Sequence, residues 1–174
     1  MLKICCALLF FISGIAFAQP PEMKLGAGGF NPIDVNIPAT KPEKLVSLTK
    51  TWALERERRN TDKDKGYDFT TVSDNTITLT GFKKNAFYYN NLGEQFEHRI
   101  QYTMKFTFYE DRYNLVFTVT QIYTDNNVPV QSSLSDYFTG EGTLKEGYTN
   151  LDTSLETTVN NIVQSHYETL MNFR

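Results

Sequence analysis

The sequence contains little cysteine: two residues among 174, Cys5 and Cys6. Neither lies in the part of the chain that we expect to fold, because residues 1–18 have the composition of an export signal. The mature chain would then have no disulfide, no thiolate nucleophile and no cysteine-ligated metal. Its stability has to come from an ordinary hydrophobic core, for which roughly 150 residues are sufficient.

The export signal is predicted from three features of the first 18 residues. A single positive charge at Lys3 is followed by an uncharged stretch up to Phe17, and the segment ends in a small-x-small motif that signal peptidases recognise. The apolar stretch is short for a membrane span. We expect cleavage between Ala18 and Gln19, and export to the periplasm, the cell surface or the medium of a Gram-negative bacterium.

Clustered positive charge is also lacking. The chain has 17 Lys and Arg against 20 Asp and Glu, a formal net charge of −3. A nucleic-acid interface needs clustered cations to displace counterions from phosphates, so we expect no nucleic-acid partner. No segment after the signal approaches the roughly 20 apolar residues of a membrane helix, so the mature chain is expected not to span a membrane.

The domain organisation follows from composition. Residues 19–32 are rich in proline and glycine and are predicted to be a flexible leader. One domain is predicted over residues 33–174. It begins with a short strand at Ile33–Ile37, in which apolar and polar residues alternate up to Pro38.

Two helices are predicted. The first begins at Thr40-Lys41-Pro42-Glu43, where the Thr40 hydroxyl can cap a free amide, and it presents Leu45, Leu48 and Trp52 on one side. The second begins after Asn150 as its expected cap. Its apolar positions follow steps of three and four: Leu151, Leu155, Val159, Ile162, Val163, His166 and Leu170.

Two hairpins are predicted between the helices. In the first, Asp74-Asn75 joins Tyr67–Ser73 to Thr76–Phe82, so that Val72 faces Ile77, Thr71 faces Thr78 and Thr70 faces Leu79. In the second, a two-residue loop at Glu110-Asp111 joins the strands of a hairpin within Phe96–Tyr123. Its predicted pairs are Phe108–Tyr113, Phe106–Leu115, Met104–Phe117 and Tyr102–Val119 on the apolar face, and Thr107–Asn114, Lys105–Val116, Thr103–Thr118 and Gln101–Thr120 on the polar face.

Two stretches lack a clear pattern. Residues 83–95 are polar and contain tyrosines, and we interpret them as a loop. Residues 125–149 are long for a loop in a compact domain, so they are expected to hide a short strand or a turn of helix.

The resulting element order is β-α-β-β-β-β-α, with one apolar sheet face for two helices to cover, and it predicts an α+β two-layer sandwich with an antiparallel sheet. This order resembles the repeat unit of the TATA-box-binding protein (TBP). Together with the export signal, the Ile33–Ile37 strand, the helix bearing Trp52 and the two hairpins, it is similar to an exported family of Bacteroides-type bacteria, a domain of unknown function numbered 4468 with a TBP-like fold. The resemblance implies a fold over about residues 33–171, and no activity or site residues.

Catalytic signatures are lacking as well. The sequence has no nucleophile elbow, phosphate loop or paired-histidine helix. Of the two histidines, His98 is at the start of a strand and His166 lies in an apolar stripe, which is more typical of a structural histidine than of an acid–base or zinc site. We therefore expect no catalytic residue, no metal site and no cofactor. Dispersed carboxylates of a small hydrolase remain an alternative.

Two surface features are candidates for binding. The polar face of the long hairpin carries Thr103, Lys105, Thr107, Thr118 and Thr120. In the predicted loop, Phe87, Tyr88 and Tyr89 either stack on a ligand at the rim of that face or fold back onto the sheet edge. The sequence thus favours a non-catalytic exported module that binds a protein, a small molecule or a glycan. The alternatives are an envelope-associated hydrolase and a structural subunit of an envelope assembly. We expect a monomer or weak self-association.

Overall fold

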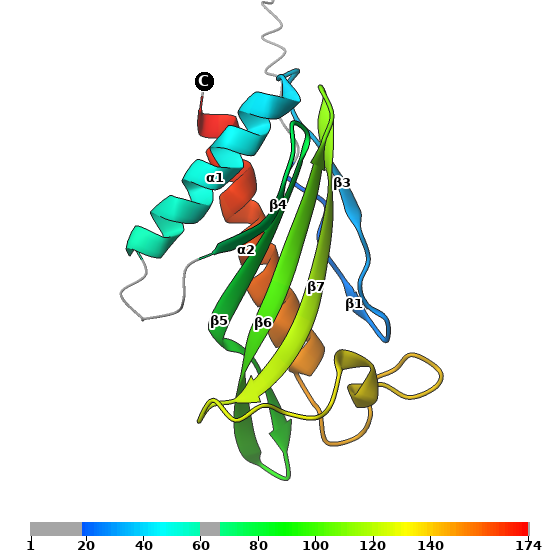
Figure 1. The fold of residues 1–174 in the computed structure, drawn as a ribbon. Coiled ribbons are helices and arrows are strands. Elements are labelled where there is room, and N and C mark those ends of the chain that lie inside the picture. The colour runs from blue at the N-terminus through cyan, green and yellow to red at the C-terminus, as the bar shows by residue number, and fades with distance from the viewer. Residues whose placement is uncertain (1–18, 60–66, 174) are drawn as a thin grey trace, which may run out of the picture.

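The computed structural model describes residues 19–59 and 67–173, and it has two layers (Figure 1). One layer is a five-stranded antiparallel sheet in the order β3-β7-β6-β5-β4. Its strands are β3 (Ile33–Asn36), β4 (Asp68–Val72), β5 (Thr76–Asn91), β6 (Glu94–Phe108) and β7 (Arg112–Thr124). The other layer holds α1 (Pro42–Arg59) and α2 (Leu151–Asn172). The predicted α+β class and element order are confirmed.

The long hairpin of β6 and β7 has the predicted register. Met104 pairs with Phe117 and Phe108 with Tyr113, and the same pairing runs back to Tyr102. The unbroken alternation of apolar and polar residues fixes this register, because a slip of one residue would turn every apolar side chain to water. The predicted Gln101–Thr120 pair is wrong. A bulge at this point places Gln101 opposite Gln121 instead.

The hairpin of β4 and β5 also differs from its prediction at a bulge. Val72 faces Ile77 and Thr71 faces Thr78 as expected, but Phe69, and not Thr70, lies opposite Leu79. Thr70 is the extra residue, and its hydroxyl lies 3.4 Å from the Thr78 carbonyl. A bulge inserts one residue without a partner, which sequence alternation alone does not reveal.

The prediction of a loop at residues 83–95 is wrong, because β5 and β6 continue through these residues as a paired hairpin. A register shift between Lys83 and Phe87 contains Asn85 at a positive φ of 46°. This bulge breaks the alternation and hides the strand in the sequence. The hairpin closes at Leu92 and Gly93, with φ of 50° and 85°, the geometry of a type I′ turn.

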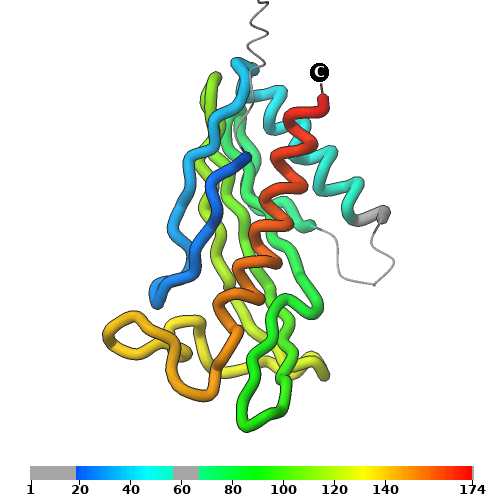
Figure 2. The backbone as a smooth tube through the Cα atoms, turned by 180° about the vertical axis from the view of Figure 1, so that it is seen from behind, coloured from blue at the N-terminus to red at the C-terminus, as the bar shows by residue number. Residues whose placement is uncertain are grey.

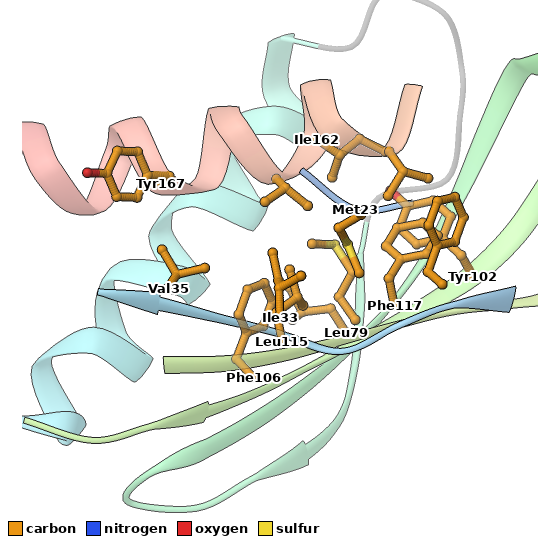
Figure 3. Packing of buried hydrophobic residues seen from close by; sticks show 14 of the residues in the cluster. Met23, Ile33, Val35, Leu79, Tyr102, Phe106, Leu115, Phe117, Ile162 and Tyr167 are labelled. Carbon is orange, nitrogen blue, oxygen red and sulfur yellow. The ribbon is translucent and has the colours of Figure 1, made fainter. Parts of the chain in front are cut away.

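The helices cover one face of the sheet. The buried positions of α2 are the predicted stripe together with Tyr167. Figure 3 shows Ile162 and Tyr167 above the apolar side chains of the strands. The helix starts differ from prediction. The Thr40 hydroxyl donates to the Pro38 carbonyl at 2.9 Å, and Asn150 lies at φ 72° without a side-chain capping bond.

Residues 19–32 were predicted to be a flexible leader, and the structure differs. The small hairpin of β1 (Leu25–Gly26) and β2 (Gly29–Phe30) lies beside the sheet and α2 (Figure 2). Met23 is 0% exposed, and Figure 3 shows it between the strands and Ile162 of α2. Asn160 of α2 bonds both backbone polar groups of Met23, at 2.8 and 3.1 Å. The segment is therefore part of the core.

The predicted loop at residues 125–149 contains, as expected, a short element. A 3₁₀ helix, η1 (Leu134–Tyr137), buries Leu134 and Tyr137. The chain before it folds back along β7, where the Val130 amide donates to the Ile122 carbonyl at 2.9 Å. Tyr137 contacts the rings of Phe87 and Tyr89 on β5, so this segment is part of the core.

The predicted export signal, with its cleavage between Ala18 and Gln19, involves residues 1–18, which lie outside the described part of the chain. Within residues 19–59 and 67–173, no helix combines the length and apolarity that a membrane crossing needs.

Candidate functional site

The sheet face opposite the helices is polar and open to solvent. On this face Lys105, Thr118 and Thr120 are exposed, whereas Thr103 and Thr107 are half-buried by their neighbours. The ladder of β6 and β7 brings Thr103, Lys105, Thr107 and Thr118 together, whereas Thr120 is exposed as the extra residue of the β7 bulge and has no partner in the described ladder. Strand β5 extends this surface, because Thr76, Thr78 and Thr80 pair with Thr107, Lys105 and Thr103 of β6. We call this polar surface of β5, β6 and β7 the threonine field.

Threonine suits such a face for a physical reason. Its branched Cβ favours extended backbone, and its hydroxyl is both a donor and an acceptor of hydrogen bonds. Lys105 is flanked by Thr78 on β5 and by Val116 on β7. The polar face therefore offers neutral hydrogen-bonding groups around Lys105, without the cluster of cations that a polyanion would need.

An aromatic pair borders the threonine field, and the sequence analysis missed it. The rings of Phe82 on β5 and Tyr123 on β7 meet edge to face at 5.5 Å. Between the two strands, Arg99 of β6 forms an ion pair with Asp125 at 3.2 Å. Phe82 continues the alternation of the β5 threonines and could have been found in the sequence, whereas the bulge in β7 conceals which face Tyr123 occupies.

The candidate residues Phe87, Tyr88 and Tyr89 do not form a common rim. Phe87 is 2% exposed and stacks on His98 at 4.9 Å. Tyr89 stacks on Phe96 at 5.3 Å, so both rings lie on the helix-bearing side of the strands. Tyr88 points to the opposite side and is 37% exposed. For Phe87 and Tyr89 the interpretation that they pack back onto the sheet is the one that fits.

The edge of β5 beside these rings is closed by α2. The Ser154 hydroxyl donates to the Tyr88 carbonyl at 2.9 Å and lies 3.2 Å from the Tyr88 amide. The Asn90 amide donates to the Thr149 carbonyl at 2.9 Å. These bonds satisfy backbone groups that an edge strand would otherwise present to another chain.

The two histidines lie in separate clusters. His166 is fully buried between Trp52 and Phe106, with ring distances of 5.1 and 4.3 Å. Burial lowers its pKa to about 3. Burial also lowers the pKa of His98, which stacks between Phe87 and Tyr89. The structure does not bring the two imidazoles together as an acid–base pair.

His166 has one hydrogen bond in this setting. The Thr49 hydroxyl donates to the Leu45 carbonyl at 2.9 Å, which leaves a lone pair to accept from His166 Nε2 at 2.9 Å. We therefore assign the proton of the neutral ring to Nε2. Nδ1 is buried without a hydrogen-bond partner. A neutral imidazole in this position serves packing and helix–helix contact.

A hydrolase that uses two carboxylates would need a concave pocket lined by them, and the described surface has three hollows to consider. The largest, about 400 Å³, lies between β5 and the first turns of α2 and is lined by Asn85, Tyr88 and hydroxyl side chains of the helix. A second of about 220 Å³ lies beside β7. The third has a volume of about 40 Å³. None of the three has an Asp or Glu in its lining. No group of three metal-ligating side chains occurs among residues 19–59 and 67–173.

Solved structures of two proteins share this architecture. The chain has the TBP-like fold, and the predicted resemblance to domain family 4468 is confirmed at the level of the fold. One neighbour is a DUF4468 family protein from Bacteroides ovatus, with a TM-score of 0.54, 11% identity, and coverage of 80% of this chain and 82% of that one. Another is a TBP-like protein from Parabacteroides distasonis, with a TM-score of 0.58, 14% identity, and coverage of 82% of this chain and 92% of that one. No family model and no curated protein matches the sequence.

Proposed function

We propose that this chain is an exported, non-catalytic binding domain that presents the open face of its sheet to a neutral polar ligand. The observation that carries the proposal is the contrast between the faces of one sheet: α1 and α2 close one of them, and neither covers the other (Figure 1). The predicted export signal supports a location in the periplasm or at the cell surface.

The chemistry of the open face supports a neutral, hydroxyl-bearing ligand such as a glycan. Threonine hydroxyls can exchange hydrogen bonds with sugar hydroxyls, and an aromatic surface can pack on the apolar side of a sugar ring. The Phe82–Tyr123 pair provides such a surface at the border of the field. Arg99 is neutralised by Asp125, so Lys105 is the central cation of the field.

The test is an NMR titration of the purified mature domain with soluble polysaccharides, both those of the bacterial envelope and dietary ones, from which the dissociation constant is obtained. The variant Thr103→Val/Thr118→Val removes two hydroxyls while it retains the branched shape, and Tyr123→Ala removes the ring. We expect both variants to weaken binding at least tenfold. A matched control, Thr157→Val on α2, should bind as well as the parent. Equal affinity of all variants would reject the open face as the site.

Self-association through a sheet edge is the second candidate. β4 is an edge strand whose five residues are all exposed, including Phe69 and Val72. Exposed edges pair readily with other strands, although a bulge such as that at Thr70 hinders this pairing. Sedimentation of the mature domain over a wide concentration range tests this candidate. A monomer at millimolar concentration would exclude it.

A further inference from the structure

The most unusual exposed apolar residue of the described chain is Leu92, at the closed end of the β5–β6 hairpin. The residue is 100% exposed, and its φ is 50°. The two central positions of a type I′ turn both require positive φ and favour Asn-Gly, because a larger side chain crowds the backbone there. The turn has the expected Gly93 but an unfavourable leucine before it. Leu92 therefore serves neither the turn nor the core.

The hairpin that presents Leu92 is held stiffly. The rings of Tyr89 and Phe96 stack across the two strands at 5.3 Å, and Tyr148 packs edge-on against Tyr89 at 5.0 Å. The Asn90 amide is bonded to Thr149. The hairpin end projects at the foot of the molecule, beyond α2 (Figures 1 and 2). A rigid projection loses little conformational entropy when it is bound.

Apolar surface continues from Leu92 along both sides of the hairpin. Phe96 is 39% exposed on the helix-bearing side, and Tyr88 is 37% exposed on the opposite side. Because the two rings point in opposite directions, a flat surface could contact only one of them. A slot that receives the hairpin end would contact both rings and Leu92 together.

The charges near the hairpin end indicate which kind of partner surface it would bind. Glu94 and Glu97 are exposed, and neither forms an ion pair within the described part of the chain. Glu97 accepts a hydrogen bond from Gln95 at 3.1 Å. Residues 85–98 contain no lysine or arginine. The carboxylates disfavour an anionic lipid surface and favour a partner with basic residues around an apolar pocket.

We propose that the hairpin end Tyr88–Glu97 is a protein-docking element, in which Leu92 inserts into an apolar pocket rimmed by Lys or Arg on a partner protein. Buried anchors of this kind concentrate binding energy at the centre of an interface. The surface is separate from the threonine field, so the proposal does not depend on the proposed function.

The test exploits the opposite effects that Leu92→Asn should have on folding and on docking. Asparagine tolerates positive φ, so this variant should raise the thermal midpoint by roughly 2–4 °C. A photo-crosslinker at Gln95 in the exported full chain, expressed in its own host, identifies the partner by mass spectrometry. That partner is then purified and titrated with parent and variants. We expect Leu92→Asn to weaken binding at least tenfold and Glu94→Gln/Glu97→Gln to reduce the salt dependence of the dissociation constant.

The control is Leu54→Gln, which removes another exposed leucine, on α1, and should leave the dissociation constant unchanged. An absence of any adduct from position 95, or a purified partner that binds Leu92→Asn as tightly as the parent, would overturn the proposal. Vesicles of phosphatidylethanolamine and phosphatidylglycerol are the second probe. Leu92-dependent binding to them without a protein adduct would replace the protein partner by a lipid surface.

Discussion

The two faces of the sheet come from the same strands, yet they experience different surroundings. On β7, Phe117 is 1% exposed and packs on Phe30 and Tyr102, whereas its neighbour Thr118 is exposed. Alternation along a strand creates this difference one residue at a time. The buried face determines stability, and the open face is free to carry a binding surface without a cost to the core.

The largest effect that would test this comparison comes from replacing neighbours on β7. Phe117→Ala leaves a cavity at a fully enclosed site and should reduce the free energy of unfolding by about 3–5 kcal/mol. Thr118→Ala should change it by less than about 1 kcal/mol, since only β-propensity and a solvated hydroxyl are lost. Urea unfolding of both variants measures the difference. Similar losses at both positions would mean that the open face is covered.

The N-terminal segment gives the next largest effect. Met23→Ala removes a side chain enclosed between the sheet and α2 and should destabilise the domain by about 2–5 kcal/mol. Pro21→Ala is the control, because Met23 and Asn160 would keep their contacts. A flexible leader would predict no change in the midpoint of urea unfolding for Met23→Ala, and that result would contradict the packing in Figure 3.

The outcomes at Met23 and in the long hairpin show what the sequence can reveal. The register from Tyr102 to Val119 was predictable because apolar and polar residues alternate without interruption, and only one register buries the whole apolar set. The docking of Met23 was not predictable. It depends on Asn160, 137 positions away, whose amide replaces the hydrogen bonds that water would otherwise supply.

The candidate site was predictable to a similar extent. Thr103, Thr107 and Thr118 lie in the regular part of β6 and β7, where the predicted pairing was correct, whereas Thr120 lies at the bulge that the alternation did not reveal. Residues 87–89 were assigned to a loop because the bulge near Asn85 concealed a strand, although the alternative that their rings pack back onto the sheet fits Phe87 and Tyr89. Leu92 was missed for a different reason. A leucine beside glycine is an unremarkable dipeptide, and only backbone geometry shows that it occupies a position that favours asparagine.

The pH dependence of stability tests the burial of His166 on the helix-bearing face. Its folded pKa of about 3 lies below the unfolded value near 6.5. Above pH 6.5 both states are neutral, so the group has no effect. Between pH 6.5 and 3 only the unfolded chain takes up the proton, so stability falls by about 1.4 kcal/mol per pH unit, or about 2 kcal/mol at pH 5.

The measurement is urea unfolding of the parent and of His166→Gln from pH 7.5 to pH 4.5. His98 and the carboxylates titrate in both proteins, so the difference between the two curves isolates His166. The difference in the free energy of unfolding between the parent and His166→Gln should become smaller as the pH falls. The reason is that the parent alone loses the contribution of this imidazole. Parallel curves would show that the imidazole is solvated, and that the buried face is less well sealed than its packing indicates.

The smallest effect is expected on the open face itself. Thr103→Val/Thr118→Val exchanges two hydroxyls for methyl groups at cross-strand partners. Valine has at least the β-propensity of threonine, and neither hydroxyl has a structural bond to lose among the described contacts. The free energy of unfolding should therefore change by less than about 0.5 kcal/mol, while ligand binding falls. A loss above about 1 kcal/mol would mean that these hydroxyls support the fold, and the proposal of a surface reserved for a ligand would then fail.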